Sequence, residues 1–182
     1  MSTASLCASL LRQRSGSATV EFALVAIPFI ALTFALLETS VLMFNQSLVQ
    51  GAVLSAARQI RTGQLQAGPG TSPSQQASVL STFQTAVCND IGAAINLTCA
   101  NLFFDVRTFA SFGSISIPAP IFDGQGNVTN TSFNTGGSAG IVTVRVIYVA
   151  TPITPGLSSL LGAGAGQPLT ITYTVVLRNE PF

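Results

Sequence analysis

A long uncharged stretch near the amino terminus dominates the pattern of hydrophobic and polar positions. No residue from Phe22 to Leu37 is charged, and the apolar character continues to Phe44 if Glu38 is tolerated. A helix that crosses a bilayer needs about 20 mostly apolar residues. The pattern therefore predicts one transmembrane segment over residues 22–44.

Beyond Phe44 the pattern becomes that of an amphipathic helix. Apolar and small side chains recur at close to helical spacing. Arg58 and Arg61 follow, and cationic side chains stabilise the carboxyl end of a helix. We therefore predict one long helix from Ser17 to Arg61 that stops near Gly63.

A second helix is expected after the loop at residues 64–71. Ser72, Pro73 and Gln75 supply an N-cap, a proline at the first helical position and the third-position partner of a capping box. Apolar residues then follow the i, i+3/i+4 rule as far as Ile95, where we expect the helix to end.

The remainder is rich in β-branched and aromatic residues, which favour strands. Four strands are predicted, over Leu102–Phe109, Ser114–Ile117, Ile141–Val149 and Leu169–Arg178. In the last of these strands apolar residues alternate with threonines, which places the apolar side chains on one face of the sheet. This pattern is expected where helices cover that face. The predicted fold class is α+β, with a packed helix and an antiparallel sheet, and residues 155–161 are expected to form a short helical turn.

Composition narrows the function classes. Only 7% of the residues are charged, the seven basic residues are all arginine, and the net charge is +1, so a basic surface for nucleic acid is not expected. The chain has no histidine, which removes the commonest general base and most zinc sites. The remaining candidate acids after the span are Asp90, Asp105, Asp123 and Glu180, and they form no pair at a diagnostic spacing. We expect no enzyme, no cofactor and no metal site.

The order of signals at the amino terminus is unusual. Arg12 and Arg14 precede the span and place the leader in the cytoplasm by the positive-inside rule. An ordinary secretory signal has its cleavage site after the apolar core, whereas Gly16-Ser17 precedes it here. This order resembles type IV prepilins, in which a membrane peptidase cuts after glycine. The expected parts are a leader at residues 1–16, a helix at 17–62 and a periplasmic domain at 63–182.

Cleavage at Gly16-Ser17 would make Glu21 the fifth mature residue, followed by Phe22. A carboxylate in a lipid-buried helix is costly, by about 2.5–3.5 kcal/mol on insertion scales, so a partner is expected. In the pilins that the sequence resembles, that partner is the amine of a neighbouring subunit. Alternatively, Glu21 lies in the first turn of the helix, where the positive end of the helix dipole stabilises its negative charge and its side chain can extend to the headgroups.

Residues 16–39, GSATVEFALVAIPFIALTFALLET, resemble the TadE-like pseudopilins of tight-adherence (Flp) pilus systems. Ala56-Ala57-Arg58, the cysteine pair and the terminal Arg-Asn-Glu-Pro-Phe also fit that family. The resemblance implies a minor pseudopilin that acts in pilus initiation or at the tip and so in adherence. It implies the prepilin peptidase, other pilins, an inner-membrane assembly platform and lipid as partners, and the inner membrane as location. Small residues at 51, 52, 55 and 56 would let other pilin helices approach closely.

A single-pass sensor or ligand-binding protein with an unprocessed amino terminus is the alternative. Glu38 either contacts a partner helix or headgroups, or simply marks the end of the span, which is the interpretation we favour.

Three smaller features concern the exported part. Cys88 and Cys99 are expected to form a disulfide in an oxidising compartment, with two buried thiols as the alternative. Asp105 and Arg107 alternate onto one strand face and are expected to pair at the surface. The segment from Asp123 to Asn127 begins like a calcium loop but lacks the final glutamate, so we predict a hairpin turn.

Overall fold

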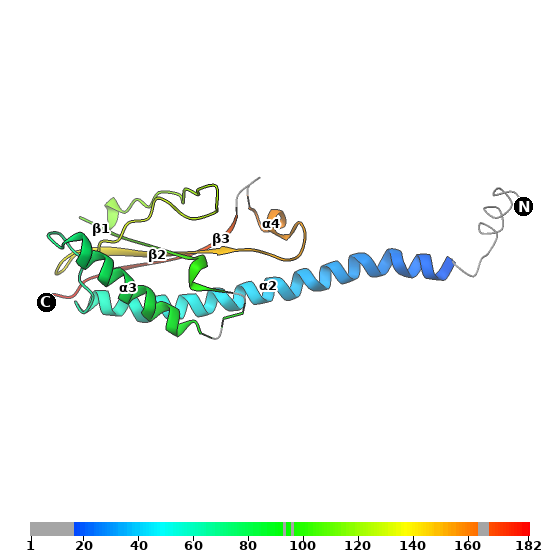
Figure 1. Cartoon of the computed structure of the whole chain (residues 1–182), viewed down its shortest axis with the longest axis horizontal. Coiled ribbons are helices and arrows are strands. Elements are labelled where there is room, and N and C mark those ends of the chain that lie inside the picture. Colours follow the sequence, from blue (N-terminus) through cyan, green and yellow to red (C-terminus); the bar gives the residue numbers. More distant parts are fainter. Residues whose placement is uncertain (1–16, 93, 96, 164–167) are drawn as a thin grey trace, which may run out of the picture.

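A long helix carries a small α+β domain on its carboxyl-terminal half (Figure 1). The computed structural model describes residues 17–92, 94–95, 97–163 and 168–182. The described elements are α2 (Ser17–Arg61), α3 (Pro73–Asp90), η2 (Cys99–Asn101), β1 (Leu102–Phe109), η3 (Phe112–Ser114), β2 (Ile141–Ala150), α4 (Leu157–Leu160) and β3 (Leu169–Arg178). The predicted α+β class is confirmed.

Helix α2 has the predicted bounds and is 45 residues long. Its end at Arg61 follows from Gly63, which adopts φ of +79° and lets the chain leave the helix. The amide of Gly63 donates to the carbonyl of Ile60, and the amide of Gln64 donates to that of Gln59. A glycine that can enter the left-handed region therefore terminates the helix where the sequence predicted.

Helix α3 begins at the predicted capping box. The Ser72 hydroxyl accepts from the amide of Gln75, and the Gln75 side chain accepts from the amide of Ser72. Its predicted end at Ile95 is wrong, because the helix stops at Asp90. Ile91 is still buried, but the chain then turns through Gly92, whose amide donates to Asn89, and heads back toward β1.

The sheet is three-stranded and antiparallel, in the order β1-β2-β3. The strand predicted at Ser114–Ile117 is wrong. Residues 112–114 form the turn η3, in which the amide of Ser114 donates to the carbonyl of Ser111. The segment then reaches Pro118 and Pro120, which have no amide hydrogen to pair with a neighbouring strand.

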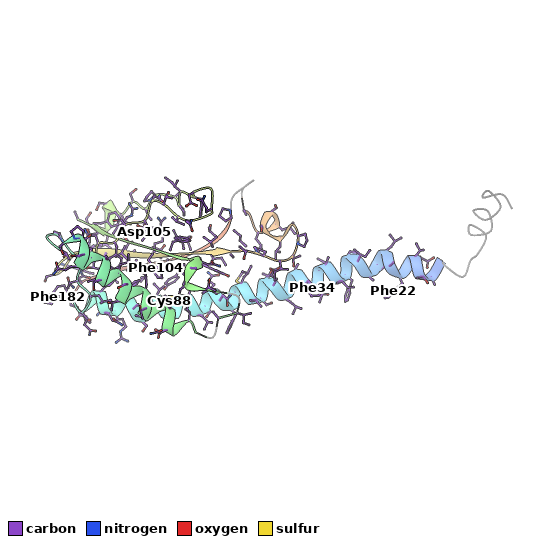
Figure 2. The ribbon with its side chains drawn as sticks, viewed as in Figure 1. Phe22, Phe34, Cys88, Phe104, Asp105 and Phe182 are labelled. Carbon is purple, nitrogen blue, oxygen red and sulfur yellow. A yellow bond between two sulfur atoms is a disulfide. The ribbon has the colours of Figure 1, made fainter. Side chains whose placement is uncertain are left out.

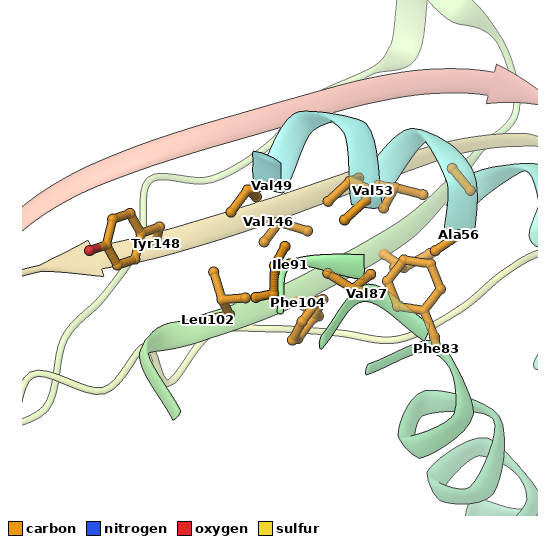
Figure 3. Packing of buried hydrophobic residues seen from close by; sticks show 14 of the residues in the cluster. Val49, Val53, Ala56, Phe83, Val87, Ile91, Leu102, Phe104, Val146 and Tyr148 are labelled. Carbon is orange, nitrogen blue, oxygen red and sulfur yellow. The ribbon is translucent and has the colours of Figure 1, made fainter. Parts of the chain in front are cut away.

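The main core lies between the sheet and the two long helices (Figure 3). Val49, Val53 and Ala56 of α2 meet Val146 of β2, while Phe83 of α3 packs edge-on against Phe104, with ring centroids 5.8 Å apart. The predicted helix-covered face of the sheet is thus confirmed, and short α4 falls within the predicted helical turn.

The opposite face of the sheet is covered by the long segment between β1 and β2 (Figure 1). The carbonyl of Pro118 in that segment accepts from Nη1 of Arg145 in β2, whereas Phe133 forms a bridge with Val106 along the outer edge of β1. As a result β2 is buried on both faces, apart from a partly exposed Val149.

A buried ion-pair cluster lies under this covering segment. Asp105 of β1 stands opposite Arg145 of β2 and accepts from its Nη2 at 2.7 Å, while Arg107 Nε donates to Asp105 at 2.9 Å. The Asp105–Arg107 pair is therefore confirmed, but its predicted surface position is wrong. Asp105 is only 1% exposed, because the segment from β1 to β2 lies over it, and the amide of Ser132 also donates to its carboxylate.

Candidate functional site: the exposed helix and its junction with the domain

The amino-terminal half of α2 projects from the domain and displays large apolar side chains. Phe22 is 73% exposed and Phe34 is 60% exposed, and both stand out from the free part of the helix in Figure 2. This is the one helix in the described part of the chain that is long and apolar enough to cross a membrane. An exposed apolar surface of this size marks a contact with lipid or with another protein.

The predicted processing and assembly residues lie at the free end of α2. Ser17 is the first helical residue, whereas Gly16 lies outside the described residues. Glu21 and Phe22 follow in the first turns of the helix, and both are exposed. The structure thus places Ser17, Glu21 and Phe22 at the end of α2 that projects from the domain.

The domain begins to contact α2 at Glu38. The backbone amides of Ile153 and Thr154, in the loop after β2, both donate to the Glu38 carboxylate, the latter at 2.9 Å. Sequence reasoning missed this contact, because nothing in the sequence pairs position 38 with a loop more than 100 residues later. Glu38 therefore joins the free part of the helix to the domain, a role that neither interpretation from the sequence included.

Two turns further along α2, a buried asparagine makes a second junction. Asn45 is 1% exposed, its Nδ2 donates to the carbonyl of Ile95 at 2.6 Å, and its Oδ1 accepts from the amide of Ile95 at 3.1 Å. The side chain thus pairs with both backbone groups of one residue, as a neighbouring strand would. It fixes the chain after α3 against α2.

An apolar groove of about 730 Å³ lies beside these junctions. Phe34 and Leu37 of α2 form one wall, and Ile95, Ile153 and Pro155 form the other. The groove therefore links the exposed apolar surface of the helix to the nearest loops of the domain.

The junctions also shift the expected limits of a membrane span. Leu42 is buried in the domain core, so the carboxyl end of the predicted 22–44 segment belongs to the domain. From Ser17 to Leu37 the helix is about 30 Å long at 1.5 Å per residue, which matches the roughly 30 Å hydrocarbon core of a bilayer.

The small residues that we expected to pack against other pilin helices differ in burial. Ala52 and Ala56 are buried in the chain's own core, 3% and 0% exposed, so for them the expectation is wrong. Their small size brings α2 close to the domain instead. Gly51 and Ser55 are exposed on the other side of the helix.

The carboxyl-terminal segment closes the far end of α2 (Figure 1). Arg61 donates through Nη2 to Glu180 at 2.8 Å, and the amide of Glu180 donates to the carbonyl of Arg61. A Cβ built on Gly63 would approach the ring of Phe182 to 2.8 Å, so only glycine leaves room for this ring. The terminal segment singled out from the sequence thus acts by holding the end of the helix.

The predicted disulfide and the predicted turn after Asp123 are also confirmed. Cys88 at the end of α3 and Cys99 of η2 form a disulfide, which ties the helix to the start of β1. The residues after Asp123 form a turn in which the amides of Gln125 and Asn127 donate to its carboxylate. The Asn127 side chain and backbone hold the pKa of Asp123 below its ordinary value. Among the described residues, no group of three or more cysteine, aspartate or glutamate side chains is arranged to hold a metal ion.

The architecture defines a class of protein with one exposed apolar helix at the amino terminus and a small α+β domain, compatible with a single-pass membrane anchor. The family model described as TadE-like protein matches residues 16–58, which is the residue before α2 and all but the last three residues of this helix. This match confirms the TadE-like resemblance and is consistent with a TadE-like protein of Tad pilus systems. No significant match to a curated protein or to a solved structure is found.

Proposed function

We propose that the chain is a minor pseudopilin of a Tad pilus, processed by the prepilin peptidase between Gly16 and Ser17 and acting in initiation or at the tip. The observation that carries the proposal is the free, apolar half of α2, preceded directly by Arg-Ser-Gly and within the TadE-like match. In this role the chain catalyses no reaction and takes no cofactor, and surface adherence follows from the pilus that it helps to build.

The free half of α2 has two successive environments in this proposal. Before assembly it crosses the inner membrane, with the amino terminus in the cytoplasm and the domain in the periplasm. During assembly the platform extracts it, and its apolar side chains exchange lipid for the helices of other pilins. The exposed Phe22 and Phe34 fit both environments, since neither is used by the domain.

Glu21 sets the register of this exchange. Within an apolar environment a carboxylate is stabilised by a cation, and processing at Gly16-Ser17 creates a new amine at the end of each neighbouring helix. A subunit whose helix is placed so that amine and Glu21 meet is favoured over one displaced along the helix. The domain, held to α2 from Glu38 onward, then follows the same register.

Replacement of Glu21 by glutamine tests this function. We expect Glu21→Gln to be processed and inserted normally but to lower the number of pili per cell, because the amide carries no charge. Glu180→Gln is the matched control, since it removes an exposed carboxylate at the far end of α2 and should leave piliation unchanged.

Two results would contradict the proposal. Normal piliation by the Glu21 variant would remove its assigned role, and normal piliation after deletion of the whole chain would remove the function itself. In the second case, an intact leader would support the single-pass sensor instead.

A further inference from the structure

The end of the domain nearest the free half of α2 exposes apolar side chains. Ile153 is 81% exposed and Leu160 is 82% exposed, and Ile95 and Pro155 are exposed beside them. We call these four residues the collar. Figure 1 shows the loop after β2 next to α2, with helix α4 on the other side of this loop, at the end of the sheet that faces the free helix.

The contact with Glu38 fixes the depth along α2 of the loop that carries Ile153 and Pro155 of the collar. Because the amides of Ile153 and Thr154 donate to the Glu38 carboxylate, this loop lies level with residue 38. About 30 Å of apolar helix precedes that level, measured at 1.5 Å per residue, which is the thickness of a hydrocarbon core. In a membrane-spanning α2, the collar would lie where the outer edge of the hydrocarbon meets the headgroups.

The two leucines of helix α4 differ sharply in exposure. Leu157 is buried in the domain at 3% exposure, whereas Leu160, almost one turn later, points away from it. The buried leucine is explained by the core, but the exposed one contributes nothing to folding. Together with Ile153 in the preceding loop, Leu160 forms part of an exposed apolar surface, which is typical of a contact with an apolar environment.

The charge pattern agrees with a lipid contact. No charged residue occurs between Arg145 and Arg178, so the connection from β2 to β3, which carries Ile153, Pro155 and Leu160 of the collar, is uncharged. Several of the charges of the domain lie at its other end, including Arg61 and Glu180. Burial of a charge in the interface would oppose insertion. Among the described residues that line the groove beside the collar, Glu38 is the one that can ionise, and two backbone amides already donate to its carboxylate.

We propose that the collar inserts into the periplasmic surface of the bilayer and braces the domain against the membrane. This inference rests on the proposed anchoring by α2. It favours lipid over a protein partner because the groove between the collar and α2 is continuous with Phe34 and Leu37, which face lipid in the anchored state. The bilayer then holds the domain at one height and tilt until extraction.

Single tryptophan residues test the contact directly, because the chain has no natural tryptophan. The full chain is reconstituted in phosphatidylcholine vesicles, with or without phosphatidylcholine brominated near the headgroup end of its acyl chains. Leu160→Trp and Ile153→Trp report on the collar. Phe34→Trp reports on the span, and Phe112→Trp is the matched control, an exposed apolar position beyond the other end of β1.

We expect loss of fluorescence in brominated vesicles for Leu160→Trp, Ile153→Trp and Phe34→Trp, and no loss for Phe112→Trp. Quenching at Phe34 without quenching at either collar position would overturn the inference while leaving the anchor intact. Protection of the collar from aqueous iodide without quenching by bromine would show that protein covers it, and would also overturn the inference. Absence of quenching at Phe34 would contradict the anchor and with it the proposed function.

Discussion

Replacement of Asp105 by asparagine should strongly destabilise the domain. The carboxylate is 1% exposed and accepts from Arg145, Arg107 and the amide of Ser132. Arg145 is itself 5% exposed, so the variant leaves a buried guanidinium without its opposite charge. Removal of one partner from a buried ion pair costs about 3–5 kcal/mol, a large part of the stability of about 5–15 kcal/mol typical of a domain.

The surface pair between Arg61 and Glu180 provides the matched control. Both of its side chains are about half exposed, at 55% and 48%, and exposed pairs contribute up to about 1 kcal/mol. Urea unfolding of the full chain in detergent, followed by circular dichroism, measures both variants. We expect a much lower midpoint for Asp105→Asn and almost none of that change for Glu180→Gln.

The double variant Asp105→Leu/Arg145→Met checks the cause. If the loss comes from an uncompensated buried charge, removal of both partners should recover much of the stability. Equal midpoints for Asp105→Asn and Glu180→Gln would refute the reasoning, since burial would then make no difference to the pair.

Three further predictions concern the junctions and the turn. Asn45→Ala should lower the free energy of unfolding by about 1–3 kcal/mol, because the backbone of Ile95 loses both partners, while exposed Gln50→Ala should change it little by the same urea assay. Paired replacement of Cys88 and Cys99 by serine should lower it by about 2–4 kcal/mol, and reduction of the wild-type chain should have the same effect while leaving the variant unchanged. The folded pKa of Asp123 is lowered, so its contribution to the turn is present above the unfolded pKa and is lost as pH falls through the folded value. Carboxyl-carbon NMR should show Asp123 titrating below an ordinary aspartate, and Asn127→Ala should raise its pKa; an unshifted Asp123 would contradict the hydrogen bonds of the turn.

Features set by neighbouring residues could be predicted from the sequence. The bounds of α2 follow from an apolar run and a glycine stop, and the start of α3 follows from a capping box that involves residues 72–75. Strand β3 shows its buried face through simple alternation. The residues of the processing site were also assigned from local order alone, and that assignment stays a prediction.

Features that depend on contacts between distant residues could not be predicted. Asp105 is buried because a segment more than ten residues later folds over it, and its opposite partner Arg145 is set by strand register. The end of α3 depends on the turn that brings Ile95 to Asn45, and the role of Glu38 depends on the loop at Ile153. Likewise, Ala52 and Ala56 look like a helix-packing surface until the domain that covers them is known.

The proposed pilus function requires that the prepilin peptidase remove the leader before α2 enters the pilus. Mass spectrometry of the amino-terminal peptide, from membranes with and without the peptidase, tests it most directly. When the peptidase is present, we expect a mature chain that begins at Ser17. When it is absent, we expect an uncleaved chain in which Gly16 is still bonded to Ser17. An intact leader in the presence of active peptidase would contradict the account.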